Sequence, residues 1–268
     1  MYNLHTHTNY SHDGKCTLFE LVEGAVNVLD GIAVTEHYDF IKSGSEKIVE
    51  TAVKCYKDVL KAREIYQGKI KIFMGGEFGE EDENINLGNE LRSAIPFDMI
   101  SCSHHIIPEL KSAKDFGYYY DFKNATKKEL DYFMNLYVDG LLKSITSTDV
   151  DVLCHLTLPV RYIMRSGNNY DVTKLDNKFE TLLRTHIKNG GALEVNTSEF
   201  DTLNLFMPDK HFLEMFKSLG GELITIGSDA HTPSRLNVGL FEAVKLIKEV
   251  GFDSYCYFEN RKPYKIKI

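Results

Sequence analysis

The sequence contains no CxxC pair, and its five cysteines are scattered along the chain. Such usage is typical of reduced thiols and argues against a disulfide framework. No apolar run approaches the roughly 18 residues that a membrane span needs. Residues 1–5 carry no basic or apolar signal segment. We therefore expect a cytoplasmic protein without a membrane anchor.

An excess of basic residues is also missing, since 31 Lys and Arg stand against 39 Asp and Glu, a formal net charge of -8. Nucleic-acid-binding proteins usually present a basic surface, so we expect no nucleic-acid partner. A small phosphorylated substrate is not excluded, because bound metal ions reverse the local charge at a site.

The chain does have a regular alternation of short apolar segments and amphipathic stretches. The apolar segments, rich in Val, Ile and Leu, are 2–4, 32–35, 70–75, 97–102, 150–154, 192–195 and 223–226. The predicted helices are 18–29, 45–67, 126–142, 173–189, 208–219 and 238–250. Strands of this kind, each followed by a helix, predict a parallel sheet that is either open or closed. With no linker, low-complexity tract or repeat, we interpret 1–268 as one domain.

The segment 105–124 departs from this alternation. It is long, contains three consecutive tyrosines and follows a predicted strand. We predict a loop over the mouth of a barrel, because long loops in compact domains are often functional.

Residue types that bind metals follow nearly every predicted strand. In chain order they are His5, His7, Glu36, His37, Glu77, His104, His155, Asn196, Asp229 and His231. The carboxyl ends of parallel barrel strands form the face where active sites lie. Residues i and i+2 of a strand point the same way, so His5 and His7 can converge on one ion, as can Asp229 and His231. Imidazole with carboxylate suits zinc, manganese or iron.

A single histidine is more often a surface or core residue than a ligand. Here seven of the ten histidines lie at or just after predicted strand ends, which reverses that expectation: His5, His7, His12, His37, His104, His155 and His231. We expect ordinary packing for His186 and a surface position for His211. His105 is expected to point away from the cluster, because it neighbours His104 in an extended backbone.

Seven motifs in this order resemble those of the PHP (polymerase and histidinol phosphatase) superfamily. They are LHTHTNYSHDG, VTEHYDF, GGEFGEE, SCSHHI, VLCHLTLPVRY, LEVNTSEF and IGSDAHTPSRL. Three of them, TEHYDF, HLTLPVRY and EVNTSEF, are most similar to the monofunctional histidinol-phosphate phosphatases of bacteria. The resemblance implies a distorted (β/α)7 barrel, like a TIM barrel, with a three-metal centre at the carboxyl ends of the strands.

The resemblance also implies a ligand set, with zinc, iron or manganese as the ions. For the first ion the implied ligands are His5, His7, Glu77 and Asp229. For the second they are Glu77, His104 and His155. For the third they are His37, His231 and a residue of the turn 11–13, where family members use histidine or aspartate. Of the adjacent His12 and Asp13, we favour Asp13 for its distance from His5.

The implied activity is the hydrolysis of L-histidinol phosphate to L-histidinol and phosphate, a step of histidine biosynthesis. A hydroxide bridging two metals would attack phosphorus. The catalytic candidates are Glu77, Asp229 and His231, with Glu77 bridging two ions.

Substrate contacts are expected from basic and polar side chains at the mouth. Arg161 is the first candidate, because a guanidinium can bind phosphate through two donors. Arg235 and Asn196 follow, although Asn196 fits a purely structural hydrogen bond equally well. Arg165 and Lys15 are weaker candidates. The acids considered for binding the substrate's amine or imidazole are Glu36, Asp39, Glu80 and Glu199.

Three other functions stay open. A phosphatase for phosphotyrosine or another small phosphate ester would have the same catalytic centre. A proofreading exonuclease is disfavoured because the chain lacks a basic groove. A metal-binding module without activity is disfavoured because every implied ligand position is filled, and because structural zinc sites are usually closed and cysteine-rich.

Overall fold

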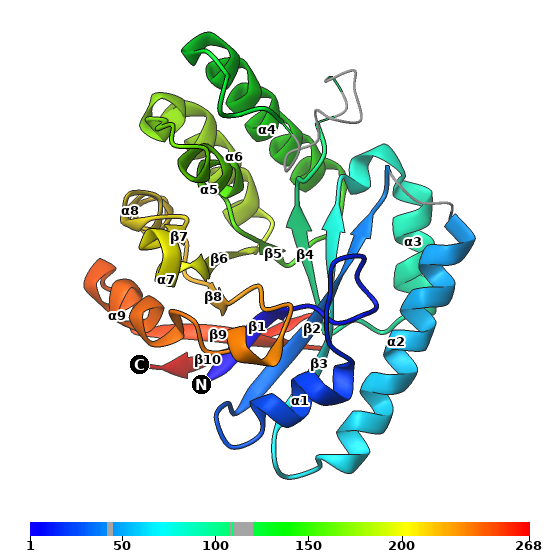
Figure 1. The fold of residues 1–268 in the computed structure, drawn as a ribbon. Coiled ribbons are helices and arrows are strands. Elements are labelled where there is room, and N and C mark those ends of the chain that lie inside the picture. The colour runs from blue at the N-terminus through cyan, green and yellow to red at the C-terminus, as the bar shows by residue number, and fades with distance from the viewer. Residues whose placement is uncertain (42–44, 108, 110–119) are drawn as a thin grey trace.

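Parallel strands surround the centre of the molecule, and helices cover them from outside (Figure 1). The computed structural model describes residues 1–41, 45–107, 109 and 120–268. The parallel strands are β1 (Tyr2–Thr6), β2 (Gly31–Asp39), β3 (Lys71–Gly79), β4 (Met99–Ser103), β5 (Val152–Leu153), β6 (Ala192–Glu199) and β8 (Ile224–Gly227). A bridge between Thr6 and Ala230 joins the end of β8 to β1. Within the described residues, the predicted seven-stranded barrel is confirmed, and it is nearly closed.

The helices lie outside this barrel. They are α1 (Leu18–Ala25), α2 (Ser45–Ile65), α3 (Ile85–Ala94), α4 (Lys127–Ser147), α5 (Leu158–Arg165), α6 (Asp176–Lys188), α7 (Phe200–Leu203), α8 (Lys210–Ser218) and α9 (Leu240–Val250). The predicted capping box of Thr17 with Glu20 begins α1, and an equivalent box at Thr126 begins α4. In the described part of the chain, no helix is long and apolar enough to cross a membrane.

Several short elements lie outside the predicted ones. Asn84 caps α3 by accepting a hydrogen bond from the Leu87 amide, and Pro159 lies in the first turn of α5. Both are ordinary helix starts, Asn at the N-cap and Pro at the first turn. β7 (Leu205–Met207) pairs antiparallel with β6. The loop predicted at 105–124 falls largely outside the described residues.

A C-terminal hairpin was also not predicted. β9 (Ser254–Glu259) and β10 (Lys262–Lys267) pair antiparallel through a two-residue turn. The turn residues Asn260 and Arg261 both have positive φ, 51° and 63°. Two such residues in a row form the turn type that favours Asn-Gly, and Arg in place of Gly weakens the sequence signal.

The inside of the barrel changes from apolar to polar along the strands. An apolar plug fills the end where the strands begin, and its residues are Leu4, Ala33, Phe73, Met99, Val152, Ala192, Cys256 and Phe258. Alternate residues of a strand share a face. The face of β2 that carries Ala33 therefore also carries His37, and the face of β3 that carries Phe73 carries Glu77. The plug thus supports a polar layer at the carboxyl ends.

We expect Phe73→Ala to lower the free energy of unfolding by about 3–5 kcal/mol, because it leaves a cavity in the plug. Phe73 is 3% exposed. Urea unfolding followed by circular dichroism measures the change. Phe241→Ala is the matched control, since Phe241 is 58% exposed and its loss should change stability by about 0.5 kcal/mol or less. Equal losses in the two variants would contradict the role of the plug.

Candidate metal centre

The buried carboxylate of Glu77 lies at the middle of the polar layer. In the parallel register, Glu77 is the partner of His37 on β2 and of Ser101 on β4. Its Oε1 lies 2.7 Å from His155 Nε2 and 3.1 Å from His105 Nε2. Its Oε2 lies 2.8 Å from His37 Nδ1, 3.4 Å from His5 Nε2 and 3.6 Å from His7 Nε2. Five imidazoles from four parts of the barrel therefore surround one carboxylate.

A second carboxylate, Asp229, follows β8 in a left-handed conformation with φ 53°. Its Oδ1 lies 3.2 Å from His7 Nε2 and 3.9 Å from His5 Nε2. The ligand atoms of His5, His7 and Asp229 lie within 4.8 Å of one another, as a metal site requires. The predicted convergence of His5 and His7 is present in the structure.

The turn that contains His12 and Asp13 lies at the edge of the cluster. Asp13 lies 3.1 Å from His231 Nε2 and 3.6 Å from His37 Nε2. The His12 ring lies 5.2 Å from the His37 ring, centroid to centroid. His7, His37 and His231 form another group with ligand atoms within 4.8 Å. Asp13 thus contacts two members of this group.

The prediction that His104 and not His105 points into the cluster is wrong. His105 contacts Glu77 and also places Nδ1 3.1 Å from Asp39 Oδ1. His104 packs against α4, so closely that a Cβ at Gly140 would lie 2.2 Å from its Nε2. Met99 points into the barrel as part of the plug. His105 is six residues further along the chain, and residues an even number of positions apart in an extended segment share a face.

Of the three histidines that were not expected to bind metal, two have the predicted surroundings. His186 is buried and bonds to the Ala192 carbonyl at 2.8 Å, and His211 is 41% exposed beside Asp176. Both agree with the expectation, so only His105 of the three joins the cluster.

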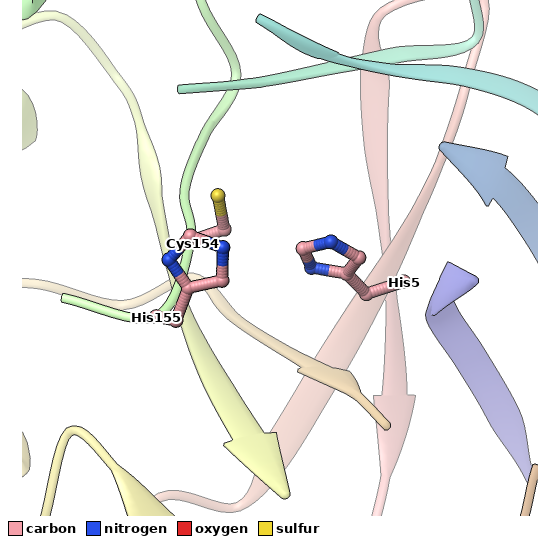
Figure 2. Close-up of side chains that lie close together, drawn as sticks. All are labelled: His5, Cys154 and His155. Carbon is pink, nitrogen blue, oxygen red and sulfur yellow. The ribbon is translucent and has the colours of Figure 1, made fainter. Parts of the chain in front are cut away.

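Figure 2 shows His5 of β1 across from Cys154 and His155, which follow β5. Atoms of these three side chains lie within 4.8 Å of one another. The Cys154 thiol donates to the Cys102 carbonyl at 3.0 Å and lies 3.6 Å from Glu77 Oε1. A cysteine thus lies beside the cluster, although none was expected there.

Charge and burial act on this cluster in opposite directions. Burial opposes the ionisation of Glu77, but the positive charges of His105, His37 and His5 hold its pKa well below the usual value. Burial, together with the charge of His37, lowers the pKa of His7 to about 3, so His7 is neutral. In the protein without metal, protons on the histidines therefore balance the acids. Metal ions would displace those protons.

The cluster contains buried polar atoms whose close neighbours are not aligned for a hydrogen bond. Among the described residues these buried atoms include Nε2 of His5, His7 and His231, and Oε2 of Glu77. Buried polar atoms of folded proteins nearly always have a partner. Imidazole nitrogens and carboxylate oxygens are the donors that zinc, iron and manganese accept. These residues therefore fit a divalent metal site.

A hollow of about 460 Å³ opens beside the cluster. Its lining includes Lys15, Arg161, Arg165, Ser198, Asp229, His231 and Arg235. The Arg161 Nη1 lies 3.4 Å from Asp229 Oδ2, and its buried Nε has no hydrogen-bond partner in the described structure. Arg235 bonds to both oxygens of Asp201, and Arg165 to both oxygens of Glu199. Arg161 donates instead to Ser198 and Tyr162, and of these three arginines it is the one not paired with both oxygens of a carboxylate.

The acids considered for substrate recognition are engaged within the protein. Glu36 accepts from Thr8 and Ser11, and Glu80 from the backbone amides of His105 and Ile106. Asp39 lies against His105, and Glu199 accepts from Arg165. All four are 6% exposed or less. The structure therefore does not favour Glu36 or Glu80 as substrate contacts, whereas Glu199 lines the hollow.

Asn196 is likewise engaged at both ends of its amide. Its Nδ2 donates to Glu194 Oε1 at 2.8 Å, and its Oδ1 accepts from the amide and hydroxyl of Ser198. These contacts favour a structural role for Asn196 over a substrate contact. Glu194 itself was not singled out in the sequence, although it lies two residues before Asn196 on the same face of β6.

We expect His105→Ala to lose bound zinc, whereas His104→Ala retains it, because only the His105 ring faces Glu77. His104→Ala should instead lower the melting temperature, since it empties space against α4. Metal analysis of the purified variants, with His7→Ala as the positive control, measures the difference. Zinc loss in His104→Ala with normal content in His105→Ala would reverse the assignment.

The chain is similar to known proteins over most of its length. A family model described as the PHP domain matches residues 3–198. A histidinol-phosphatase of Lactococcus lactis is 25% identical over 98% of this chain and 96% of its own length. A probable histidinol-phosphatase of Clostridium acetobutylicum is 24% identical over 97% of this chain and 98% of its own.

One solved structure shares the fold closely. It is the histidinol phosphate phosphatase of Lactococcus lactis, complexed with zinc, L-histidinol and phosphate. Its TM-score is 0.79 at 24% identity, with 98% of each chain covered. Since the family model spans most of the sequence, the protein belongs to the PHP domain family.

Proposed function

We propose that this protein is a metal-dependent phosphomonoesterase that hydrolyses L-histidinol phosphate to L-histidinol and inorganic phosphate. The observation that carries the proposal is the convergence of five imidazoles on buried Glu77, next to a hollow that contains Arg161. The relatives named histidinol-phosphatase, and the similar structure complexed with zinc, L-histidinol and phosphate, support this substrate.

We further propose three divalent ions, zinc, iron or manganese, held by three overlapping groups of ligands. The first group is His5, His7, Glu77 and Asp229. The second is Glu77, His105 and His155, with His105 in place of His104. The third is His37, His231 and Asp13. Each group is supported by the contacts between its members.

When bound, divalent ions lower the pKa of water so that hydroxide is available, and they neutralise phosphoryl oxygens. Glu77 can serve two ions, because imidazoles contact both of its oxygens. Arg161 orients the phosphoryl group from the hollow. Asp229 and His231 line the same hollow and are the candidates to guide a proton to the leaving oxygen.

We expect phosphate release from L-histidinol phosphate to exceed release from p-nitrophenyl phosphate and phosphotyrosine by at least about tenfold in kcat/KM, a difference of about 1.4 kcal/mol. A chelator should abolish turnover, and added Zn²⁺ or Mn²⁺ should restore it. Equal slow turnover of all three esters would contradict the substrate. Turnover that resists the chelator would contradict the metal centre, and cleavage of a short single-stranded DNA would favour an exonuclease.

Arg161→Ala should reduce kcat/KM for the phosphate ester by about 10- to 100-fold, because a hydrogen bond to a charged group contributes about 1.5–3 kcal/mol. Arg235→Ala is the matched control, and its effect should be smaller because Asp201 already occupies the Arg235 guanidinium. Steady-state kinetics measures both, with metal content determined in parallel. Unchanged kinetics in Arg161→Ala at full metal content would remove Arg161 from the site.

A further inference from the structure

Glu194 of β6 lies directly behind the metal cluster and is 1% exposed. Its Oε2 lies 2.7 Å from His5 Nδ1. Its Oε1 accepts from Asn196 Nδ2 at 2.8 Å and from the His155 amide at 3.3 Å. One carboxylate thus contacts the ring of His5 and the backbone of His155, two members of the cluster that arise from distant parts of the chain.

We propose that Glu194 is a positioning residue that holds His5 with its proton on Nδ1 and its Nε2 directed at the metals. An ionised carboxylate only accepts hydrogen bonds, so the ring atom facing it must carry the proton. When a metal ion displaces the second proton of His5, the lone pair is therefore left at Nε2, the buried atom that faces Glu77 and Asp229 at 3.4 and 3.9 Å. Figure 2 shows this ring across from His155.

The same arrangement recurs at other histidines of the cluster. Nδ1 of His105 lies 3.1 Å from Asp39, and Nδ1 of His231 lies 2.9 Å from the Asp229 carbonyl. Nδ1 of His7 lies 3.3 Å from the Ser11 hydroxyl, which in turn donates to Glu36. Each of these rings has an oxygen at Nδ1 and leaves Nε2 toward the cluster. Such outer partners fix the ring and its tautomer at metal sites in general.

Glu194 also acts on His155 through the backbone. His155 has φ 24°, a positive value that is uncommon for a residue with a side chain. Its amide donates to Glu194 Oε1. This hydrogen bond, together with the one to His5, ties the two sides of the cluster to one carboxylate.

The hydrogen-bond donors around Glu194 determine how a glutamine at this position would be oriented. Asn196 and the His155 amide both donate to the Oε1 position, so a glutamine would place its carbonyl oxygen there and its NH₂ group against His5 Nδ1. Two donors would then face each other unless His5 moved its proton to Nε2. That tautomer has no lone pair at Nε2, the atom that faces the cluster, although the shape of the residue 194 side chain is almost unchanged.

The test is zinc affinity of the full chain, measured with Zn²⁺ alone against a chromophoric chelator. We expect Glu194→Gln to weaken zinc binding by about 10- to 100-fold, at least as much as Glu194→Ala, with a melting temperature close to wild type. A side chain that only filled space would give the opposite order, with alanine the more harmful change. No substrate is needed, so the result is independent of the proposed phosphatase activity, although it rests on the proposed metal centre.

Asp98→Asn is the matched control. Asp98 is also a buried carboxylate, but it accepts from the Met74 amide at 2.8 Å and from Arg63, away from the cluster. This variant should lose stability and keep its zinc affinity. Wild-type zinc affinity in Glu194→Gln would overturn the proposal. If that variant did not fold, wild-type affinity in Glu194→Ala would overturn it equally.

Discussion

The buried carboxylate of Glu77 lies where the strands of the barrel bring five imidazoles together. An isolated anion in a protein interior is strongly destabilising unless positive charge and hydrogen-bond donors surround it. Here imidazoles from β1, β2 and the segments after β4 and β5 provide them. Those elements are distant in sequence, so only a nearly closed barrel in one register brings them to the same point. Whatever balances the charge, protons or metal ions, must bind at this place.

The barrel interior is organised in layers around that carboxylate. Below it lies the apolar plug, completed by the C-terminal hairpin through Cys256 and Phe258. Behind the His5 and His105 rings lie carboxylate oxygens of Glu194 and Asp39, at the Nδ1 atoms. Acids that the sequence offered as substrate contacts therefore belong to the protein's internal network. The chain as a whole has a net charge of -8. The positive charge that a phosphate would need is supplied at the hollow itself, by side chains such as Arg161.

Much of the fold could be predicted because it depends on local periodicity. The parallel strands are short runs of buried apolar residues, and capping boxes such as Thr17 with Glu20 are complete within four residues. The hairpin was missed because its turn, Asn260-Arg261, lacks the glycine that usually marks such turns. α5 was missed because it is short, and its main signal is the single Pro159.

Residue type and period-two alternation are local properties, so the sequence was sufficient to predict the kinds of ligand and the end of the barrel where they gather. It could not determine which of two adjacent histidines faces inward. That depends on the phase of the chain beyond the end of β4, where His105 shares the face of Met99 and His104 packs against Gly140. Nor could the sequence pair Glu194 with His5, or Asp39 with His105. Those pairings join residues up to 189 positions apart, and only the closed barrel places them within hydrogen-bond distance.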